Sequence, residues 1–453
     1  MTKSLLLDTN NQNILAAAKQ VLTYNTTSEG IIIPAQGLYP HQVLWDSCFI
    51  AIGLSNYNLK LAQKQILTLL KAQWLNGMIP NIVFSPGLRY WLDRHIWRSR
   101  IAPQSNPNFA TGGITQPPML AEAVVRIGNK LTTSKRKQWY RSVYPALLAY
   151  HEWLYIERDP KNRGLVTLIH PWETGLDNTP PLIATLRHQH EPRWINLVTR
   201  LKLDKLADHI RFDAKYVDYR QRNSTIEALS LYAALRRLRK QKYNTQRILE
   251  KPPFAIEDLT YNCILIRANE LLSEIAKTIN ETLPPLIKNR IIRAESSLDQ
   301  LWDNDQSEYF SRNFTWDSFI REPSIAALLP LYSGAVSPLR ALELVKSITS
   351  FENKGVNFPV PSVPPDSSWF KPMGYWQGPT WINMNWLIID GLKRYGFNRQ
   401  AELLTRKTLD LVGNNGFYEY FNPLNGNPAG IANFSWSAAL AIDLIMNTKA
   451  TEL

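Results

Sequence analysis

Helical periodicity runs through most of this chain, and it constrains the fold more than any other feature of the sequence. In the segment 57–74, Leu59, Ala62, Ile66 and Leu69 recur at steps of three and four residues and so share one helix face. About a dozen segments show such a pattern or an apolar stretch of helical length. These segments are 10–24, 45–54, 57–74, 117–130, 135–156, 198–209, 224–241, 255–280, 284–303, 322–331, 337–349, 381–395, 398–412 and 434–446.

Strand patterns are scarce by comparison. Only the segment 358–363 suggests extended chain, and its prolines argue against a central strand. The loops between the helical segments alternate between short and long, as expected when helical hairpins form a ring with the long, site-forming loops at one end. No Gly/Ser linker, composition break or fixed-period repeat divides the sequence. We therefore predict an all-α fold, a single domain over residues 1–453, arranged as an (α/α)6 barrel, or toroid.

The loop from Asn76 to Asn108 is long and contains Tyr90, Trp91 and Trp97. Loops of this length in compact domains are functional or disordered, and the aromatic content argues against disorder. Many of the 15 tryptophans of the chain also lie in Gly- and Pro-containing stretches outside the periodic helices. An indole ring stacks on a ligand while its N–H donates a hydrogen bond, so such residues predict pocket walls that suit a sugar.

The formal net charge of +13 raises the question of a nucleic-acid partner. The basic residues, however, concentrate in the segments 135–141 and 236–242, where apolar residues with helical spacing separate them. Solvated helix faces explain this pattern better than a nucleic-acid interface. An anionic small substrate or an acidic surface partner is also compatible with the positive charge.

Two cysteines, Cys48 and Cys263, lie in apolar helical segments without CxxC spacing, which predicts buried thiols in a reducing compartment. The apolar run 5–7 is too short for a signal peptide. No window approaches the ~18 apolar residues of a membrane span. We therefore expect a soluble, cytoplasmic protein without a membrane partner, and the sequence leaves its oligomeric state open.

Carboxylates set among aromatic residues are the most promising chemical groups. The sequence has no HExxH, Cys/His cluster, GxxxxGK[ST], GxGxxG or GxSxG motif to support metal, phosphate-loop or serine-nucleophile chemistry. Hydrolysis of a glycosidic bond uses two carboxyl groups, one protonated and one ionised, and burial among aromatic rings raises a carboxyl pKa toward neutrality. Asp46 follows a tryptophan, Asp177 lies in the turn-rich segment 170–178, and Glu419 stands between two tyrosines. Structural alternatives are a helix N-cap for Asp46, an Asx turn for Asp177 and a hydrogen-bonded loop residue for Glu419.

Several blocks of the sequence resemble the small, single-domain members of glycoside hydrolase family 63, and most closely the mannosylglycerate and glucosylglycerate hydrolases. They occur in the order of that family from about residue 38 to residue 440, so the resemblance covers almost the whole chain. The blocks are Leu44–Phe49, Gln73–Pro80, Gly113–Pro118, the central loop through Asp177–Asn178, Tyr375–Trp381 with Asn383 and Asn385–Trp386, Glu419–Pro423 and Phe434–Trp436.

The resemblance implies an inverting α-glycosidase that hydrolyses a small α-glycoside, glucosylglycerate or mannosylglycerate, without a metal or redox cofactor. It implies Asp177 as the general acid and Glu419 as the general base. An acid aglycone requires a cation, for which the resemblance indicates Arg211, with Tyr90 as a further aglycone contact. The remaining residues implied to bind substrate are Tyr39, Trp45, Asp46, Gln116, Trp172, Gly175, Tyr375, Trp376, Gln377 and Trp381.

The sequence departs from the family pattern at two places. Val43 replaces an aromatic residue that these enzymes often carry, and a histidine-rich run at 188–190 replaces a more regular continuation after the central loop. Both departures leave the choice of sugar and aglycone open. The alternatives are therefore an α-glucosidase acting on a disaccharide or short oligosaccharide, and a non-hydrolytic sugar isomerase or epimerase on the same barrel. An isomerase of this kind is expected to use histidine acid/base pairs, for which only His41 and His170 lie in the matched blocks.

Overall fold

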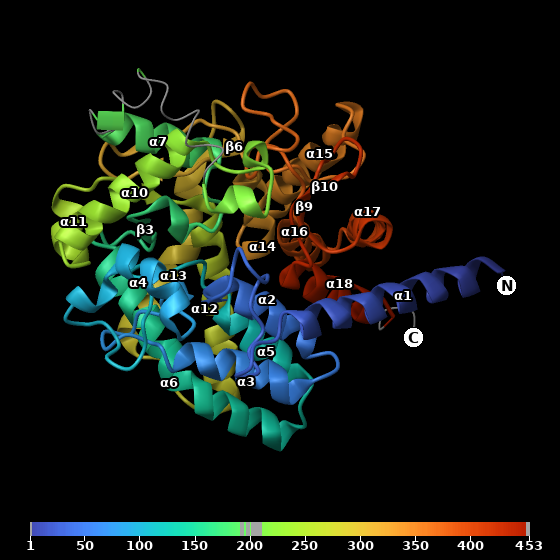
Figure 1. Cartoon of the computed structure of the whole chain (residues 1–453), viewed down its shortest axis with the longest axis horizontal. Helices are drawn as coiled ribbons and strands as arrows, with labels where there is room; N and C mark the ends of the chain where they lie inside the picture. Colours follow the sequence, from blue (N-terminus) through green and yellow to red (C-terminus); the bar gives the residue numbers. More distant parts are fainter. Residues whose placement is uncertain (1, 191–193, 196–199, 201–210, 450–453) are drawn as a thin grey trace.

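The structure, a computed structural model, describes residues 2–190, 194–195, 200 and 211–449, and in this part of the chain it is predominantly helical (Figure 1). The helix expected at 198–209 lies almost entirely outside the described residues. The helices are α1 (Thr2–Tyr24), α2 (Leu44–Leu54), α3 (Leu59–Leu70), α4 (Trp91–Trp97), α5 (Leu120–Asn129), α6 (Thr133–Arg158), α7 (Pro180–His190), α10 (Thr225–Lys240), α11 (Thr245–Glu250), α12 (Leu259–Thr278), α13 (Pro285–Ser297), α14 (Pro330–Ser333), α15 (Pro338–Asn353), α16 (Ile382–Arg394), α17 (Asn398–Asn415) and α18 (Ser435–Lys449).

Six of the described helices form a closed inner ring. In the order α2, α5, α12, α14, α16 and α18 each packs against the next, and α18 packs back against α2. A second set flanks the ring, with α3 on α2, α6 on α5, α13 on α12, α15 on α14, α17 on α16 and α1 on α18. Figure 1 shows α18 and α2 next to each other where the ring closes. The predicted all-α fold and its (α/α)6 arrangement are confirmed.

The sequence distinguishes the inner helices from the flanking ones. Every residue of the inner helix α2 is buried, in agreement with its almost uninterrupted apolar sequence. In the flanking helix α3, the buried residues are confined to one face. Ring closure also requires a small residue, because a Cβ on Gly53 of α2 would lie 2.6 Å from the Cα of Ala439 in α18. The inner ring is thus specified by apolar composition and by close packing.

Short connections lead from the inner helices α2, α5, α12, α14 and α16 to their flanking partners, as in the turns 55–58, 130–132 and 395–397, whereas α18 and its partner α1 lie at opposite ends of the sequence. Long segments, such as 71–119, 159–258 and 354–381, return the chain from a flanking helix to the next inner helix. All long segments therefore enter the ring at the N-terminal ends of inner helices. This arrangement gathers them at one end of the barrel, as the alternation of loop lengths predicts.

Short strands occur in these long segments. The longest pair is the antiparallel hairpin of β9 (Tyr418–Phe421) and β10 (Pro428–Ala432), whose register is irregular between Ala429 and Ala432. The segment 358–363, expected to be extended, contributes an isolated bridge from Pro361 to Thr380 instead of a strand. The other strands are β1 (Gln42–Val43) with β2 (Ile82–Val83), β5 (Trp302–Asp303) with β6 (Glu308–Tyr309), and a four-stranded sheet of β3 (Thr167–Leu168), β4 (Ile256–Glu257), β7 (Arg312–Asn313) and β8 (Ser318–Phe319).

The structure also locates the cysteines and the basic segments of the sequence. Cys48 and Cys263 are free and buried, as expected. The basic segments 135–141 and 236–242 lie on or beside helices α6 and α10, where their charged side chains alternate with buried residues. Among the described helices, none combines the length and apolarity that crossing a bilayer would need.

Candidate active site

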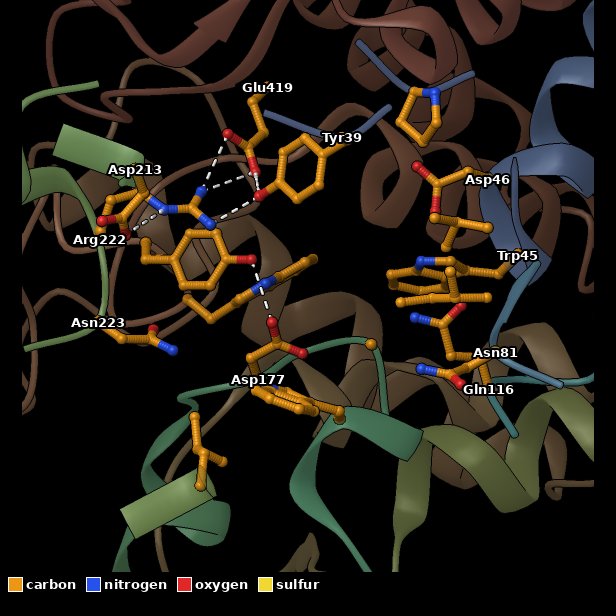
Figure 2. A pocket seen from close by; sticks show the side chains of 18 of the residues that line it. Tyr39, Trp45, Asp46, Asn81, Gln116, Asp177, Asp213, Arg222, Asn223 and Glu419 are labelled. Carbon is orange, nitrogen blue, oxygen red and sulfur yellow. Dashed lines mark hydrogen bonds and ion pairs between the residues drawn. The ribbon is translucent and has the colours of Figure 1, made fainter. Parts of the chain in front are cut away.

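A cavity of about 350 Å³ opens where the long segments meet the inner ring. Its walls come from the N-terminal ends of α2, α16 and α18, from the hairpin β9–β10 and from the loops preceding α5, α7 and α10. Figure 2 shows Asp177 and Glu419 entering this cavity from different sides, with Asp46 and Trp45 at another edge. The lining residues are Pro34, Tyr39, Val43, Trp45, Asp46, Asn81, Ile82, Trp97, Gln116, Trp172, Gly175, Asp177, Arg211, Asp213, Arg222, Asn223, Ala228, Leu231, Tyr375, Trp376, Trp381, Glu419, Phe434 and Trp436.

Glu419 is held on β9 with its carboxylate almost fully buried, at 2% exposure. Its Oε1 accepts a hydrogen bond from the Tyr39 hydroxyl at 2.7 Å and one from Nη1 of Arg222 at 3.0 Å. Its Oε2 accepts a hydrogen bond from the backbone N–H of Ile431 on β10 at 3.2 Å. The hairpin also requires Gly430, since a Cβ there would lie 2.6 Å from Oε2. These contacts fix the direction in which the carboxylate points.

Asp177 projects from the loop between the short helix η3 (Pro171–Glu173) and α7. The hydroxyl of Tyr375 donates a hydrogen bond to its Oδ2 at 3.2 Å. Burial raises the pKa of Asp177 to about 6, while the charge of Arg222 and the Tyr375 hydrogen bond act in the opposite direction. A carboxyl group with such a pKa can carry a proton near neutral pH and release it.

The loop that carries Asp177 is anchored on both sides. Asn178 Oδ1 accepts a hydrogen bond from the Trp376 N–H at 3.0 Å, and Nε2 of Gln377 donates to the Asn178 carbonyl at 3.0 Å. The side chains of Asp177 and Asn178 therefore form hydrogen bonds with the distant residues Tyr375 and Trp376, and not the Asx turn considered as an alternative. At the start of the loop, Gly175 adopts φ +73°, and a Cβ there would lie 2.5 Å from the ring of Trp45.

The same loop contains a second acid, Glu173, which has a structural role. Glu173 is fully buried and binds Arg158 bidentately, with distances of 2.8 and 2.9 Å. Its Oε2 also accepts the Ile169 N–H at 2.7 Å. With its lone pairs engaged in the protein interior, Glu173 ties the loop to α6 and leaves Asp177 as the acid of this loop that faces the cavity.

Asp46 lies in the first turn of α2, but the helix N-cap position is occupied by Val43. The N-cap alternative for Asp46 is therefore wrong. Its carboxyl group is buried at 4% exposure and lines the cavity beside Trp45. Burial raises the pKa of Asp46 well above its usual value, and the charges of Glu419 and Asp177 add to the effect. Such a group is suited to hydrogen bonds with ligand hydroxyls.

Aromatic rings form much of the cavity wall. Trp376 and Trp381 stack face to face with ring centroids 3.7 Å apart, and Trp45 lies 6.3 Å from Trp376. Trp436 meets Trp45 edge to face at 5.4 Å. Because these rings support one another, the wall is preorganised to receive a flat apolar face of a ligand.

The structure brings most of the predicted site residues together in the cavity. Two of them lie elsewhere. Gln377 is buried behind the wall, where its Nε2 also approaches Oε1 of Glu227 at 3.3 Å, so it supports the Asp177 loop. Tyr90 packs edge to face on His41 at 4.8 Å and is not part of the lining. The residues that line the cavity as expected are Tyr39, Trp45, Asp46, Gln116, Trp172, Gly175, Asp177, Arg211, Tyr375, Trp376, Trp381 and Glu419.

The sequence did not identify Arg222, Asp213 or Asn223 as site residues. They lie in the segment 211–224, which contains three arginines and two aspartates without a recognisable motif. Arg211 forms two hydrogen bonds with the Asp213 carboxylate, at 3.0 and 2.5 Å. The Nε of Arg222 lies 3.9 Å from the same carboxylate. Two guanidinium groups therefore meet at one side of the cavity.

The histidines named for the isomerase alternative do not form an acid/base pair in the cavity. His170 is buried, with Nε2 3.0 Å from the Leu231 carbonyl, and burial lowers its pKa to about 4. His41 pairs with Asp93 at 3.2 Å. Neither residue is part of the cavity lining, so the carboxyl groups are the acid/base candidates.

Comparisons with known proteins agree with this site. The sequence profile of the mannosylglycerate hydrolase MGH1-like glycoside hydrolase domain matches residues 39–437. The chain is 37% identical over 432 residues to a mannosylglycerate hydrolase of Thermus thermophilus, covering 94% of this chain and 99% of that protein. It is 31% identical over 429 residues to a glucosylglycerate hydrolase of Mycolicibacterium hassiacum, covering 90% of this chain and 92% of that protein. It also resembles the crystal structure of a GH63 mannosylglycerate hydrolase from Thermus thermophilus in complex with Tris and D-glycerate, with a TM-score of 0.84 and 34% identity over 95% of this chain and 99% of that chain.

Proposed function

Because the chain belongs to the mannosylglycerate hydrolase MGH1-like glycoside hydrolase family, we propose that it hydrolyses mannosylglycerate or glucosylglycerate with inversion at the anomeric carbon. In this proposal Asp177 is the general acid and Glu419 the general base. The observation that carries it is the presence of both carboxyl groups in one cavity in contrasting surroundings. Asp177 is desolvated with a pKa of about 6, whereas Glu419 is bound by a guanidinium group.

The reaction follows from these surroundings. Protonated Asp177 donates its proton to the glycosidic oxygen as the bond between this oxygen and the anomeric carbon breaks. A water molecule attacks the anomeric carbon from the opposite face and transfers a proton to ionised Glu419. The products are the sugar with inverted configuration and the free aglycone. Asp46 and the tryptophan wall hold the sugar, because a carboxylate accepts bonds from hydroxyls and an indole face covers the apolar face of the ring.

The acid aglycone is placed by charge. A glycerate carboxylate is matched by a guanidinium group that donates two parallel hydrogen bonds. Arg211 lines the cavity and can supply such a group by exchanging its internal partner, Asp213, for the substrate. We therefore place the aglycone at the side of the cavity formed by Arg211, Asp213 and Asn223. This placement makes the substrate a small acidic glycoside.

The roles of the acid and the base are tested with two kinds of substrate, one with a poor leaving group and one with a good leaving group. Asp177→Asn is expected to lose hydrolysis of the glycerate glycosides by roughly 10²–10⁴-fold, because the leaving oxygen receives no proton. It should retain much of its activity on the corresponding α-glycosyl fluoride, whose fluoride leaves without protonation. Glu419→Gln should lose activity on both substrates, since the attacking water is no longer activated. NMR detection of the first-formed anomer reports inversion, and comparison of the mannosyl and glucosyl substrates identifies the sugar.

Asp366→Asn is a matched control, because Asp366 is an exposed carboxylate that pairs with Lys354 and is not part of the cavity lining. Its turnover should equal that of the unmodified enzyme. Near-normal hydrolysis of a glycerate glycoside by Asp177→Asn or Glu419→Gln would remove that residue from the mechanism. Formation of the retained anomer would exclude the inverting reaction.

A further inference from the structure

Arg222 contacts Glu419, the proposed general base, directly through its guanidinium group. Its Nη1 lies 3.0 Å from Oε1 and 3.2 Å from Oε2 of Glu419. Its Nη2 donates a hydrogen bond to the Tyr39 hydroxyl at 2.6 Å, and that hydroxyl in turn donates to Oε1 of Glu419. We propose that Arg222 is a positioning residue that pairs with the Glu419 carboxylate and aims it at the attacking water. This inference rests on the proposed role of Glu419 as general base.

The surroundings of Glu419 show why a cation is needed. A carboxylate at 2% exposure has lost most of its hydration, so a negative charge there is costly unless it is paired. A neutral carboxyl group cannot accept the proton of a water molecule. The guanidinium group beside it supplies the opposite charge at 3.0 Å, and it stays protonated at any working pH. Figure 2 shows the Arg222 side chain directed at Glu419 with the connecting interactions drawn.

The orientation of Arg222 is determined on several sides. The guanidinium carbon lies 4.2 Å from the ring centroid of Tyr375, whose hydroxyl is bonded to Asp177. The side chain of Arg222 is only 11% exposed, and its Nε faces Asp213 at 3.9 Å. Arg222 thus stacks on the residue that contacts the acid while it binds the base. A planar guanidinium group can make all of these contacts at once. A lysine ammonium would reproduce the charge, but it would not stack on the Tyr375 ring or donate two parallel hydrogen bonds.

The backbone around Arg222 is docked onto the hairpin that carries Glu419. The Tyr420 hydroxyl donates a hydrogen bond to the carbonyl of Gln221, and the Gly430 N–H donates to Oε1 of Gln221 at 2.9 Å. On the other side, Ser224 begins helix α10 with a capping box. Arg222 therefore stands between two fixed points, one on the hairpin and one at a helix N-terminus. Such support is what a group with a precise geometric role requires.

The alternative is that Arg222 only binds the substrate carboxylate. In that case its removal raises KM for acidic substrates, leaves neutral glycosides unaffected and does not change the pH profile. A positioning role instead lowers kcat for acidic and neutral glycosides alike. It also moves the acidic limb of the pH profile to higher pH, because loss of the guanidinium group leaves a buried carboxylate without its counter-charge.

The test compares the variants Arg222→Gln and Arg222→Lys with the control Arg220→Gln. The substrates are mannosylglycerate, glucosylglycerate and the neutral α-glycosyl fluorides. For each substrate, kcat and KM are measured from about pH 4 to about pH 9, which covers both limbs of the profile. We expect Arg222→Gln to lower kcat at least about 100-fold on both substrate classes and to move the acidic limb upward by about one pH unit or more. Arg222→Lys should move the limb back toward that of the unmodified enzyme, because the charge is restored. Arg220, exposed and paired with Asp218, should be replaceable without effect.

An increase in KM confined to the glycerate substrates, with an unchanged acidic limb, would overturn the positioning role. Thermal unfolding identifies any variant that fails to fold. If Arg222→Gln does not fold, the pH profile of Arg222→Lys decides. An unshifted acidic limb and an unchanged kcat in Arg222→Lys would then overturn the inference. Glu419→Gln separates this inference from the proposed function. An active Glu419→Gln enzyme refutes the assignment of the base, whereas an inactive one together with an unshifted Arg222 variant refutes the role of Arg222 alone.

Discussion

The hydroxyl of Tyr375 donates a hydrogen bond to Oδ2 of Asp177 at 3.2 Å. This bond stabilises the ionised form of Asp177 and so opposes the rise in its pKa that burial produces. Tyr375→Phe keeps the ring under Arg222 and removes only the hydroxyl. We expect the basic limb of kcat/KM, which reports loss of the acid's proton, to move to higher pH, and the maximal kcat/KM to fall about tenfold because the acid is less well oriented. The control Tyr24→Phe, at an exposed tyrosine, should leave the pH profile unchanged. An unshifted basic limb in Tyr375→Phe would show that the Tyr375 hydroxyl does not influence the ionisation of the acid.

The raised pKa of Asp177 also makes a prediction for stability. A carboxyl group whose pKa is raised to about 6 in the folded protein binds its proton more tightly there than in the unfolded chain. Its contribution to stability is therefore complete at pH values below about 4, the unfolded pKa, and is lost as pH rises through about 6. Asp177→Asn lacks this ionisation, so it should be more stable than the unmodified protein at about pH 7 by about 1–3 kcal/mol, with no advantage at about pH 4. Thermal unfolding at both pH values measures the difference, and a pH-independent difference would contradict the assigned pKa.

The buried pair of Glu173 and Arg158 makes a second prediction for stability. Removal of the charge in Glu173→Gln leaves the Arg158 guanidinium uncompensated in the protein interior. We expect a loss of about 3–5 kcal/mol in the free energy of unfolding, measured with chemical denaturant. Glu343→Gln provides the control, because Glu343 forms an exposed pair with Lys346 and should change stability by ~0–1 kcal/mol. A similarly small change in Glu173→Gln would mean that the loop is held by other contacts.

The fold could be predicted from the sequence because its determinants are local. Helix α2 is almost uninterruptedly apolar, α3 is apolar on one face, and the loop lengths indicate which ends of the helices meet. The hairpin of β9 and β10 could not be predicted, because four residues from Tyr418 to Phe421 are too few for an alternating pattern to emerge. The helical pattern of residues 198–209 remains a prediction, since it lies almost entirely outside the described residues.

Asp177 and Glu419 could be proposed as the acid and the base only through the family resemblance, because the residues around them also fit an Asx turn and a hydrogen-bonded loop residue. Arg222 was missed because its partner Glu419 is remote in sequence, and neither neighbourhood indicates the contact. The family resemblance implied Gln377 as a sugar contact, yet its side chain points toward Asn178 behind the wall. Side-chain direction in an irregular loop depends on distant packing, which the sequence of that loop does not contain.

Substitution of Gly175 tests whether the close contact between the Asp177 loop and the Trp45 ring positions the loop. In Gly175→Ala the new methyl group would lie 2.5 Å from the Trp45 ring in a backbone conformation, φ +73°, that disfavours alanine. We expect a loss of activity of at least about tenfold and of stability by about 1–3 kcal/mol, since either Trp45 or the Asp177 loop must move. Gly396→Ala isolates the backbone cost, because Gly396 has φ +77° and an added Cβ there would meet no other group within 4 Å. Equal effects of both variants on activity would show that the contact with Trp45 does not position the loop.

Arg211 tests the recognition of the acid aglycone. Replacement by alanine should raise KM for a glycerate glycoside about 10–100-fold through the loss of a charge-assisted fork, while a neutral methyl α-glycoside is affected less than about threefold. The single variant also leaves the Asp213 carboxylate without its partner, and this negative charge would repel the substrate independently. The double variant Arg211→Ala/Asp213→Ala removes that repulsion, so a raised KM that persists in it is due to the lost guanidinium group. Inhibition by D-glycerate gives an independent measure, and Asp213→Asn, which frees Arg211 from its internal partner, should strengthen that inhibition. Unchanged KM for glucosylglycerate and mannosylglycerate in Arg211→Ala would exclude Arg211 as the aglycone cation and favour a neutral glycoside as the substrate.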